Sequence, residues 1–365
     1  MNTFFVAATG QHQGKTTTTL GLVANLMSAG IDVGYCKPVG QKHLMHNGFV
    51  ADKDSVLFSK VLDFELEPEW HSPVILGSGV TKDYLLDPEK YDFNGAILNA
   101  ARHLESTHEM VVYEGTGHVG VGSVVDLSNA QVAKLLGSRA ILVVEGGIGN
   151  TLDQITLNLA LFREQDVPVH GVIINKFKPD KLESIRYILT RRLESQGVPV
   201  LGFIPYDRSL SFPIMSTVSQ STRARCLLHP ERMLNKVQGV MAGSLIEIDH
   251  FDDQEGILLV VNNSRFAEAI QRVITKSAEM GLDRTPLAGI VVTGDGKQGR
   301  WYKAEDFEHE YLRQHRIPLL ATPLETYDTV VMISRIEVKI NTDTDWKVSR
   351  AIELFREHVG IAPFR

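Results

Sequence analysis

The chain has 365 residues, of which 43% are hydrophobic and 22% charged, so it is long enough for two globular domains with hydrophobic cores. A net charge of −7 without a basic run excludes a general nucleic-acid-binding surface. The only two cysteines, Cys36 and Cys226, indicate a reducing compartment. The sequence shows no signal peptide and no apolar run of membrane-spanning length, so we expect a cytoplasmic protein with no membrane partner.

The first predicted element is a strand–turn–helix. Phe4–Ala8 is an apolar run typical of a buried strand, and Thr18–Leu26 has helical spacing of its apolar residues. A glycine turn with Gly-Lys-Thr between these elements is typical of a phosphate-binding loop. The usual spacing is G-x-x-x-x-G-K followed by Ser or Thr; here Thr9 occupies the first glycine position, and Gly10 comes one residue late. The alternative is an ordinary turn with a chance Gly-Lys-Thr.

This loop predicts a site for ATP and Mg²⁺. Its backbone N–H groups and the start of the following helix favour phosphate oxygens. Lys15 is then expected to reach the β- and γ-phosphates as a catalytic residue, and the Thr16 hydroxyl to ligate Mg²⁺. The residues assigned to nucleotide binding are Gly10, Gln11, His12, Gln13, Gly14, Lys15, Thr16 and Thr17.

Polar residues follow the second predicted strand, Val33–Cys36. Lys37 comes directly after it, at the carboxyl edge of a sheet, where ligands of open α/β folds bind. It is either a second catalytic lysine or a solvated charge. Asp54 opens a helical segment, Ser55–Leu62. It either caps that helix or directs a carboxylate at the Mg²⁺ site.

Two later strands also end in polar residues. Met110–Tyr113 is followed by Glu114-Gly-Thr-Gly-His. A carboxylate there could hold Mg²⁺ while the glycines leave room for the γ-phosphate; the alternative is a surface glutamate before a glycine turn. Val169–Lys176 carries Asn175 near its end. Its amide both donates and accepts hydrogen bonds, as reading a base edge requires.

Strands alternate with helices from residue 3 to about residue 206, which predicts an α/β P-loop NTPase fold with a mainly parallel sheet covered by helices on both faces. Right-handed crossovers bring the strand ends to one edge. We expect a nucleotide-binding domain at 1–210, a linker at 211–240 and a second, smaller α/β domain at 241–365.

These motifs resemble those of dethiobiotin synthetase and of the P-loop regions of long phosphate acetyltransferases and cobyrinic acid diamide synthases. The resemblance covers roughly the first 210 residues. It implies that Lys15 and Thr16 contact ATP, that Thr16, Asp54 and Glu114 hold Mg²⁺, that Lys37 lies near phosphate and substrate, and that Asn175 reads adenine. It also implies a small-molecule substrate and a homodimer. Gly40-Gln41 stands where the synthetases carry a serine, and Thr116 and His118 depart from their Glu-Gly-Ala-Gly-Gly turn. The nucleotide half of that site is therefore retained and the diamine half is not.

The second domain resembles the DRTGG domain through Ala288–Gly294 and Thr326–Thr329, and it shows no catalytic pattern. Two functions follow. The first is an ATP-dependent ligase-type enzyme that activates a small carboxylate or carbamate through an acyl phosphate. The second is an adenine-nucleotide sensor whose second domain passes the signal to a partner. Acetyl transfer is not expected, since no acetyltransferase domain follows. A membrane-partitioning ATPase is disfavoured because the loop lacks an early lysine.

Overall fold

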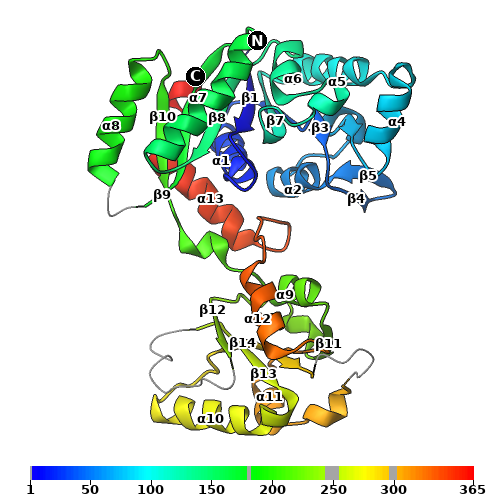
Figure 1. Ribbon diagram of the computed structural model, residues 1–365, viewed down its shortest axis with the longest axis vertical. Coiled ribbons are helices and arrows are strands. Elements are labelled where there is room, and N and C mark those ends of the chain that lie inside the picture. The colour runs from blue at the N-terminus through cyan, green and yellow to red at the C-terminus, as the bar shows by residue number, and fades with distance from the viewer. Residues whose placement is uncertain (1, 179–181, 243–254, 296–301) are drawn as a thin grey trace. The chain divides into compact units, whose positions relative to one another are not determined.

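The protein divides into two compact units (Figure 1). A computed structural model describes residues 2–178, 182–242, 255–295 and 302–365. The first unit comprises Met1–Asp207 together with Ile340–Arg365, and the second comprises Arg208–Lys339. The second unit is therefore inserted into the sequence of the first.

The first unit is built on a six-stranded sheet in the order β10-β9-β8-β1-β7-β2, and every neighbouring pair is parallel. Strand β1 lies between β7 and β8, and its residues from Thr3 onward are buried, which explains its continuous apolar run. The carboxyl ends of all six strands meet at one edge, as expected. The strands are β1 (Asn2–Ala8), β2 (Val33–Cys36), β7 (Met110–His118), β8 (Arg139–Glu145), β9 (Val169–Phe177) and β10 (Val200–Pro205).

Helices cover both faces of this sheet, which confirms the predicted fold class (Figure 1). Phe5 and Ala7 of β1 pack in one core with apolar residues of α5, α6, α7 and α8. Phe4 points to the other face, where its ring meets Phe364 at 5.6 Å between centroids. The helices are α1 (Lys15–Ser28), α2 (Lys53–Leu62), α3 (Pro68–His71), α4 (Val80–Leu86), α5 (Phe93–Thr107), α6 (Asn129–Leu135), α7 (Gly149–Glu164), α8 (Leu182–Glu194) and α13 (Asp345–His358).

Two small sheets lie between β2 and α4 in the sequence. β3 (Val39–Gly40) pairs with β6 (Val74–Ile75), and β4 (His43–His46) forms an antiparallel hairpin with β5 (Phe49–Asp52). The hairpin ends at Asp52, which leads directly into α2. The two small sheets follow β2 in the chain, and they position residues 52–54 beside the end of β2.

The last helix, α13, belongs to the first unit, whereas the sequence placed it in a second domain at 241–365. It packs against α1, the helix that follows the phosphate loop. A Cβ at Gly21 would lie 2.5 Å from the Cβ of Phe355, so glycine permits the close approach. Asn25 Nδ2 also donates to the Ile352 carbonyl at 3.0 Å. An amphipathic pattern predicts a helix, but it does not identify the surface that the helix will cover.

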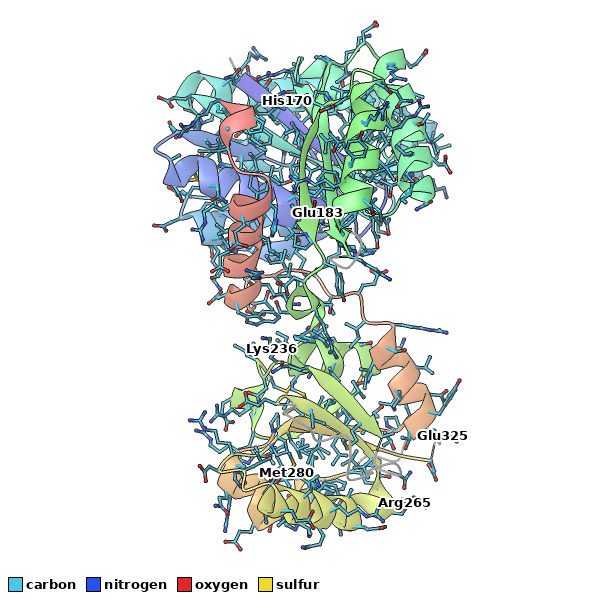
Figure 2. The ribbon with its side chains drawn as sticks, turned by 90° about the vertical axis from the view of Figure 1, so that its left-hand side faces the viewer. His170, Glu183, Lys236, Arg265, Met280 and Glu325 are labelled. Atoms are coloured by element: carbon cyan, nitrogen blue, oxygen red, sulfur yellow. The ribbon has the colours of Figure 1, made fainter. Side chains whose placement is uncertain are left out.

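The second unit is a five-stranded sheet in the order β11-β15-β14-β13-β12, with only the β11–β15 pair antiparallel among the described strands. Arg265 and Met280 mark the two ends of its long helix α10 (Figure 2). The strands are β11 (Arg225–Leu228), β12 (Gly239–Ala242), β13 (Ile257–Asn262), β14 (Leu287–Thr293) and β15 (Leu319–Thr322); the helices are α9 (Met215–Thr222), α10 (Phe266–Glu279), α11 (Glu310–His315) and α12 (Thr326–Ser334).

The expected linker at 211–240 is thus largely folded, because α9, β11 and the start of β12 lie within it. Met215 and Val218 of α9 and Val237 are buried in the core of the second unit. The prolines of this stretch suggested a linker. Its apolar residues, however, can be buried only after the later strands of the second unit have assembled.

None of the helices in the described part of the chain is both long enough and apolar enough to cross a membrane.

His71 of α3 supports the region beside the end of β2, and we expect its imidazole to make the stability of the first unit depend on pH. Its carbonyl accepts hydrogen bonds from the Lys37 backbone N–H at 2.9 Å and from Ser55 Oγ at 2.8 Å. Burial lowers the pKa of its imidazole below the usual value, despite the nearby Glu67 backbone. The unfolded chain therefore binds a proton more readily than the folded chain as pH falls below about 6.5, and stability is lost in that direction.

We expect the loss of melting temperature between pH 7.5 and 5.5 to be smaller in His71→Gln than in the wild type. His43→Gln, at an exposed histidine of β4, is the matched control and should keep the wild-type pH dependence. An unchanged pH dependence in His71→Gln would show that this imidazole does not contribute.

Candidate functional site

The turn between β1 and α1 has a backbone conformation that favours glycine. Gly14 is the N-cap residue of α1 with φ of +85°, and His12 also has a positive φ of +60°. Left-handed backbone is readily adopted by glycine and disfavoured for other residues. The start of α1 therefore follows a tight turn, and Lys15, Thr16 and Thr17 form its first turn.

Two consecutive side chains of β9 hold this loop by its carbonyl groups. Asn175 Nδ2 donates to the Gln13 carbonyl at 2.9 Å, and Lys176 Nζ donates to the His12 carbonyl at 2.5 Å. In a trans peptide the N–H points opposite to the carbonyl. The N–H groups of Gln13 and Gly14 are therefore directed away from β9. The structure thus brings Asn175 against the loop, and its expected contact with adenine stays a prediction.

Gly14→Ala should be far more damaging than the same change at another left-handed glycine. A Cβ at Gly14 would lie 2.0 Å from Asn175 Nδ2, whereas no described atom lies within 4 Å of a Cβ at Gly30, which has a similar φ of +82°. Each substitution strains the backbone by about 1–2 kcal/mol. Gly14→Ala must also displace Asn175, which adds about 1 kcal/mol through the lost hydrogen bond.

Urea unfolding measures the difference in stability, and calorimetry with ATP measures binding. We expect Gly14→Ala to unfold at lower urea than Gly30→Ala and to lose nucleotide binding, while Gly30→Ala keeps it. Equal stability of the two variants would contradict the close contact with Asn175.

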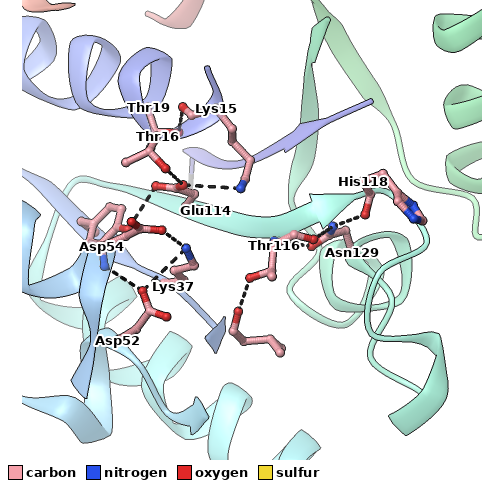
Figure 3. Close-up of polar contacts among 12 residues, drawn as sticks. Lys15, Thr16, Thr19, Lys37, Asp52, Asp54, Glu114, Thr116, His118 and Asn129 are labelled. Atoms are coloured by element: carbon pink, nitrogen blue, oxygen red, sulfur yellow. Dashed lines mark hydrogen bonds and ion pairs between the residues drawn. The ribbon is translucent and has the colours of Figure 1, made fainter. Parts of the chain in front are cut away.

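Glu114 lies in the middle of β7, which continues to His118 beyond the expected end at Tyr113, and it is completely buried, with 0% of its surface exposed. Thr16 Oγ1 donates to its Oε1 at 2.7 Å, and the Tyr35 hydroxyl donates to its Oε2 at 3.2 Å. Lys15 Nζ lies 3.6 Å from Oε1 (Figure 3). Burial, together with the Glu114 charge, raises the pKa of Tyr35 well above its usual value, so this hydroxyl stays a donor. The structure thus brings Lys15, Thr16 and Glu114 together from segments about 100 positions apart in the sequence.

Lys37 forms a second charged group beside the first. It is 5% exposed, its Nζ contacts Asp54 Oδ2, and it lies 3.6 Å from Asp52 Oδ1 (Figure 3). Burial by itself would lower the pKa of this ammonium, but Asp54, Glu114 and Asp52 together raise it above its ordinary value. Lys37 therefore stays charged. Because the carboxylates of Asp54 and Glu114 both act on it, they belong to one electrostatic cluster.

Asp52 is the residue of this cluster that the sequence analysis did not assign. It is the N-cap of α2, and its Oδ1 accepts from the Asp54 N–H at 2.8 Å, so the capping role considered for Asp54 belongs to Asp52. Burial raises the pKa of its carboxyl to about 6, even though Lys37 opposes the shift. The aspartate two residues before Asp54, just ahead of the predicted helical segment Ser55–Leu62, was the signal for a cap.

The second half of β7, after Glu114, is held by one side chain of α6. Asn129 Oδ1 accepts from the Thr116 N–H at 2.9 Å, and its Nδ2 donates to the carbonyls of Thr116 at 2.8 Å and His118 at 2.7 Å. A Cβ at Gly115 would lie 2.4 Å from Asn129 Oδ1, so glycine is needed there. The Thr116 hydroxyl donates to the Val39 carbonyl, which ties this part of β7 to β3.

The oxygen atoms of Thr16, Asp54 and Glu114 suit Mg²⁺, which prefers hard oxygen ligands. Among the described residues, no three His, Cys, Asp or Glu side chains are grouped as a metal site. Mg²⁺ commonly uses one or two protein carboxylates and completes its shell with water and phosphate oxygens, so the carboxylates of Asp54 and Glu114 are enough for it. Among the described buried polar atoms, Asp52 Oδ2 has no hydrogen-bond partner, which leaves further negative charge beside the cluster. These residues fit the metal.

The comparison with protein families covers most of the first unit. A family model described as "AAA domain" (AAA_26) matches residues 2–213. The matched range contains every residue of the site described above and ends close to the point where the chain enters the second unit.

Three curated proteins illustrate what the chain is similar to. A phosphate acetyltransferase of Synechocystis is 23% identical over 372 residues, which is 98% of this chain and 50% of that protein. The ATP-dependent dethiobiotin synthetase BioD of Nitrosopumilus maritimus is 28% identical over 216 residues, 58% of this chain and 92% of that protein. A probable cobyric acid synthase of Methanocaldococcus jannaschii is 28% identical, with 60% and 49% covered. The chain thus spans about half the length of the acetyltransferase and of the cobyric acid synthase.

Proposed function

The chain belongs to the AAA_26 family of AAA domains, and from this premise we propose that it binds Mg²⁺–ATP and transfers the γ-phosphoryl group to a small carboxylate or carbamate. Its similarity to an ATP-dependent dethiobiotin synthetase and to a cobyric acid synthase supports ligase-type chemistry. The first unit carries the reaction.

Binding rests on the loop before α1. The N–H groups that face away from β9 donate to the phosphate oxygens, and the positive end of α1 adds to the attraction. Lys15 contacts the β- and γ-phosphates. Asn175 holds the loop and takes the adenine edge with its remaining hydrogen-bonding capacity.

Thr16, Asp54 and Glu114 hold the metal. When bound, Mg²⁺ neutralises charge on the β- and γ-phosphates. Thr16 and Glu114 are already in contact, so the hydroxyl and the carboxylate are positioned before the metal arrives. The Tyr35 hydroxyl keeps Glu114 oriented from the opposite side.

The reaction proceeds in two steps. An oxygen of the carboxylate or carbamate attacks the γ-phosphorus, the bond to the β–γ bridging oxygen breaks, and ADP leaves with that electron pair. An amine then attacks the carbonyl carbon of the resulting acyl phosphate, phosphate leaves, and the amine loses a proton. Lys15 and Lys37 stabilise the charge of the transferred phosphoryl group, and the protein acts mainly by positioning and electrostatics.

One observation carries the proposal. Lys15, Thr16 and Glu114 meet at one end of the parallel sheet, and Lys37 with Asp54 stands beside them. Phosphoryl transfer uses a carboxylate that binds the metal and a second cation besides the lysine of the phosphate loop. The cluster contains both, and Lys37 is the second cation.

Trapping with hydroxylamine tests the reaction, since acyl phosphates react with hydroxylamine to form hydroxamates. The protein is incubated with Mg²⁺–ATP, hydroxylamine and a panel of small carboxylates, and ADP and hydroxamate are measured. We expect one acceptor to raise both in equal amounts. Pairs of bicarbonate and an amine test the carbamate alternative. The ligase proposal would be refuted if the rate of ADP formation changed with none of the carboxylates and none of these pairs.

The second candidate is an adenine-nucleotide sensor, and the length of the acetyltransferase match favours it. That match covers 98% of the chain and so includes both units, whereas the synthetase match covers 58%. In this role the first unit binds ATP and the second passes its state to a partner. Slow hydrolysis without acceptor dependence, with tight ATP binding, is the expected result for a sensor.

The remaining assignments are proposals. The two cysteines favour a reducing compartment, and we place the protein in the cytoplasm. By resemblance, the second unit is DRTGG-like, and the protein forms a homodimer with small-molecule sites near the subunit interface. Sedimentation at micromolar concentration tests the last point, and a mass of one chain at every concentration would exclude the homodimer.

A further inference from the structure

We propose that Asp52 is a positioning residue that receives the ammonium group of Lys37 when Mg²⁺ takes Asp54. The inference rests on the proposed function, because it concerns the same site. It assigns a role to a carboxylate that the phosphoryl-transfer scheme does not use.

The starting observation is that the proposed metal ligand is already engaged. Lys37 Nζ contacts Asp54 Oδ2 directly, and both groups lie in a largely buried site. A carboxylate has two oxygens, so Mg²⁺ and Lys37 can share Asp54, but each cation weakens the attraction of the carboxylate for the other. Metal binding therefore weakens the Lys37–Asp54 contact and favours a shift of the ammonium toward another acceptor.

A buried ammonium group without a partner is strongly unfavourable. Lys37 is almost completely buried, and Asp52 Oδ1 is 3.6 Å from its Nζ. This distance allows Asp52 to become the main partner after a small rotation of the lysine side chain. The move keeps Lys37 charged and beside the phosphates.

The carboxylate of Asp52 has the capacity for this role. Its Oδ1 caps α2 through the Asp54 N–H, while its Oδ2, among the described buried polar atoms, has no hydrogen-bond partner. A buried acceptor that is left open in this way is costly unless something uses it. Asp52 also reaches Lys37 from a fixed place, because the cap holds its side chain.

Gly40 makes room for this arrangement. A Cβ at Gly40 would lie 2.4 Å from Asp52 Oδ2 and 2.9 Å from Asp52 Cβ. A side chain at position 40 would therefore collide with the carboxylate of Asp52.

Asp52→Asn tests the proposal, because asparagine keeps the size of the side chain and is a good N-cap but removes the negative charge. Mg²⁺ is titrated into protein and ATP, and nucleotide binding is followed by calorimetry. We expect the Mg²⁺ midpoint to rise about tenfold, since a charged partner of Lys37 is lost and the lysine stays on Asp54. Melting temperature should be unchanged or higher.

Two comparisons separate this role from a structural one. In a Lys37→Met background no ammonium has to move, so adding Asp52→Asn should leave the Mg²⁺ midpoint where it is. Asp92→Asn, the same change at the N-cap of α5, is the matched control and should leave the midpoint at the wild-type value.

Three results would overturn the inference. An unshifted midpoint in Asp52→Asn alone would remove the role of Asp52 and leave the proposed function standing. An equal shift with and without Lys37 would show that Asp52 acts on the metal directly. Nucleotide binding that is independent of Mg²⁺ in the wild type would reject both the metal site and the role of Asp52.

Discussion

Lys15→Ala is expected to weaken binding of Mg²⁺–ATP by about 100-fold or more, because a lost hydrogen bond to a charged group costs about 1.5–3 kcal/mol and in the proposed site Lys15 contacts two phosphates. The side chain lies 3.6 Å from the buried carboxylate of Glu114 and is itself largely buried. Removing it also leaves that carboxylate with one cation fewer. Isothermal calorimetry with ATP and Mg²⁺ measures the affinity.

Lys134→Ala, at an exposed lysine of α6, is the control for the loss of one positive charge and should bind ATP as the wild type does. Circular dichroism must show that Lys15→Ala keeps the wild-type fold at the temperature of the titration. Unchanged affinity in a folded Lys15→Ala protein would refute the assignment of the phosphate loop.

Glu114→Gln should abolish the dependence of ATP binding on Mg²⁺ and lower the rate of phosphoryl transfer by at least about 100-fold. The variant keeps the shape of the side chain but removes the negative charge that faces Lys15 and Thr16. Its amide group must also face the Tyr35 hydroxyl, which donates in the wild type. Titration of Mg²⁺ at saturating ATP, together with single-turnover ADP formation, measures the two effects.

Glu145→Gln provides a matched control at the same edge of the sheet. Glu145 ends β8, which β1 separates from β7, and it is exposed, so the same change alters the local charge without touching the cluster. It should retain the wild-type Mg²⁺ midpoint. If Glu114→Gln and Glu145→Gln shifted the midpoint equally, the effect would come from the general field at this edge and not from a metal ligand.

The parallel sheet and the position of the phosphate loop could be predicted because both depend on local patterns. An apolar run followed by Gly-Lys-Thr and an amphipathic segment predicts a strand, a tight turn and a helix, and the structure has them at β1 and α1. Glu114 and Lys37 could be chosen for a similar reason. Lys37 follows β2, and Glu114 follows the apolar run Met110–Tyr113 with which β7 begins; parallel strands place their carboxyl ends at one edge.

The role of Asp52 could not be predicted in the same way. The sequence contains Asp52 and Asp54 in one polar stretch, and only the hairpin of β4 and β5 decides which of them caps α2 and which contacts Lys37 through Oδ2. The hydrogen bonds by which Asn175 and Lys176 hold the phosphate loop were missed for a similar reason. Asn175 was expected to face a base, and its contact with the Gln13 carbonyl depends on how closely β9 approaches β1 across β8.

The sequence by itself determined the main parallel sheet of the first unit, the edge at which its strands end, and the residue types able to hold a triphosphate and Mg²⁺. These follow from periodicity and spacing, which act over a few residues. Only the tertiary structure decided that 208–339 is inserted into the first unit, that α13 packs on α1, and that Lys37 lies between two carboxylates. These depend on which buried surfaces match after the chain has collapsed, and contacts between residues far apart in sequence leave no local pattern to read.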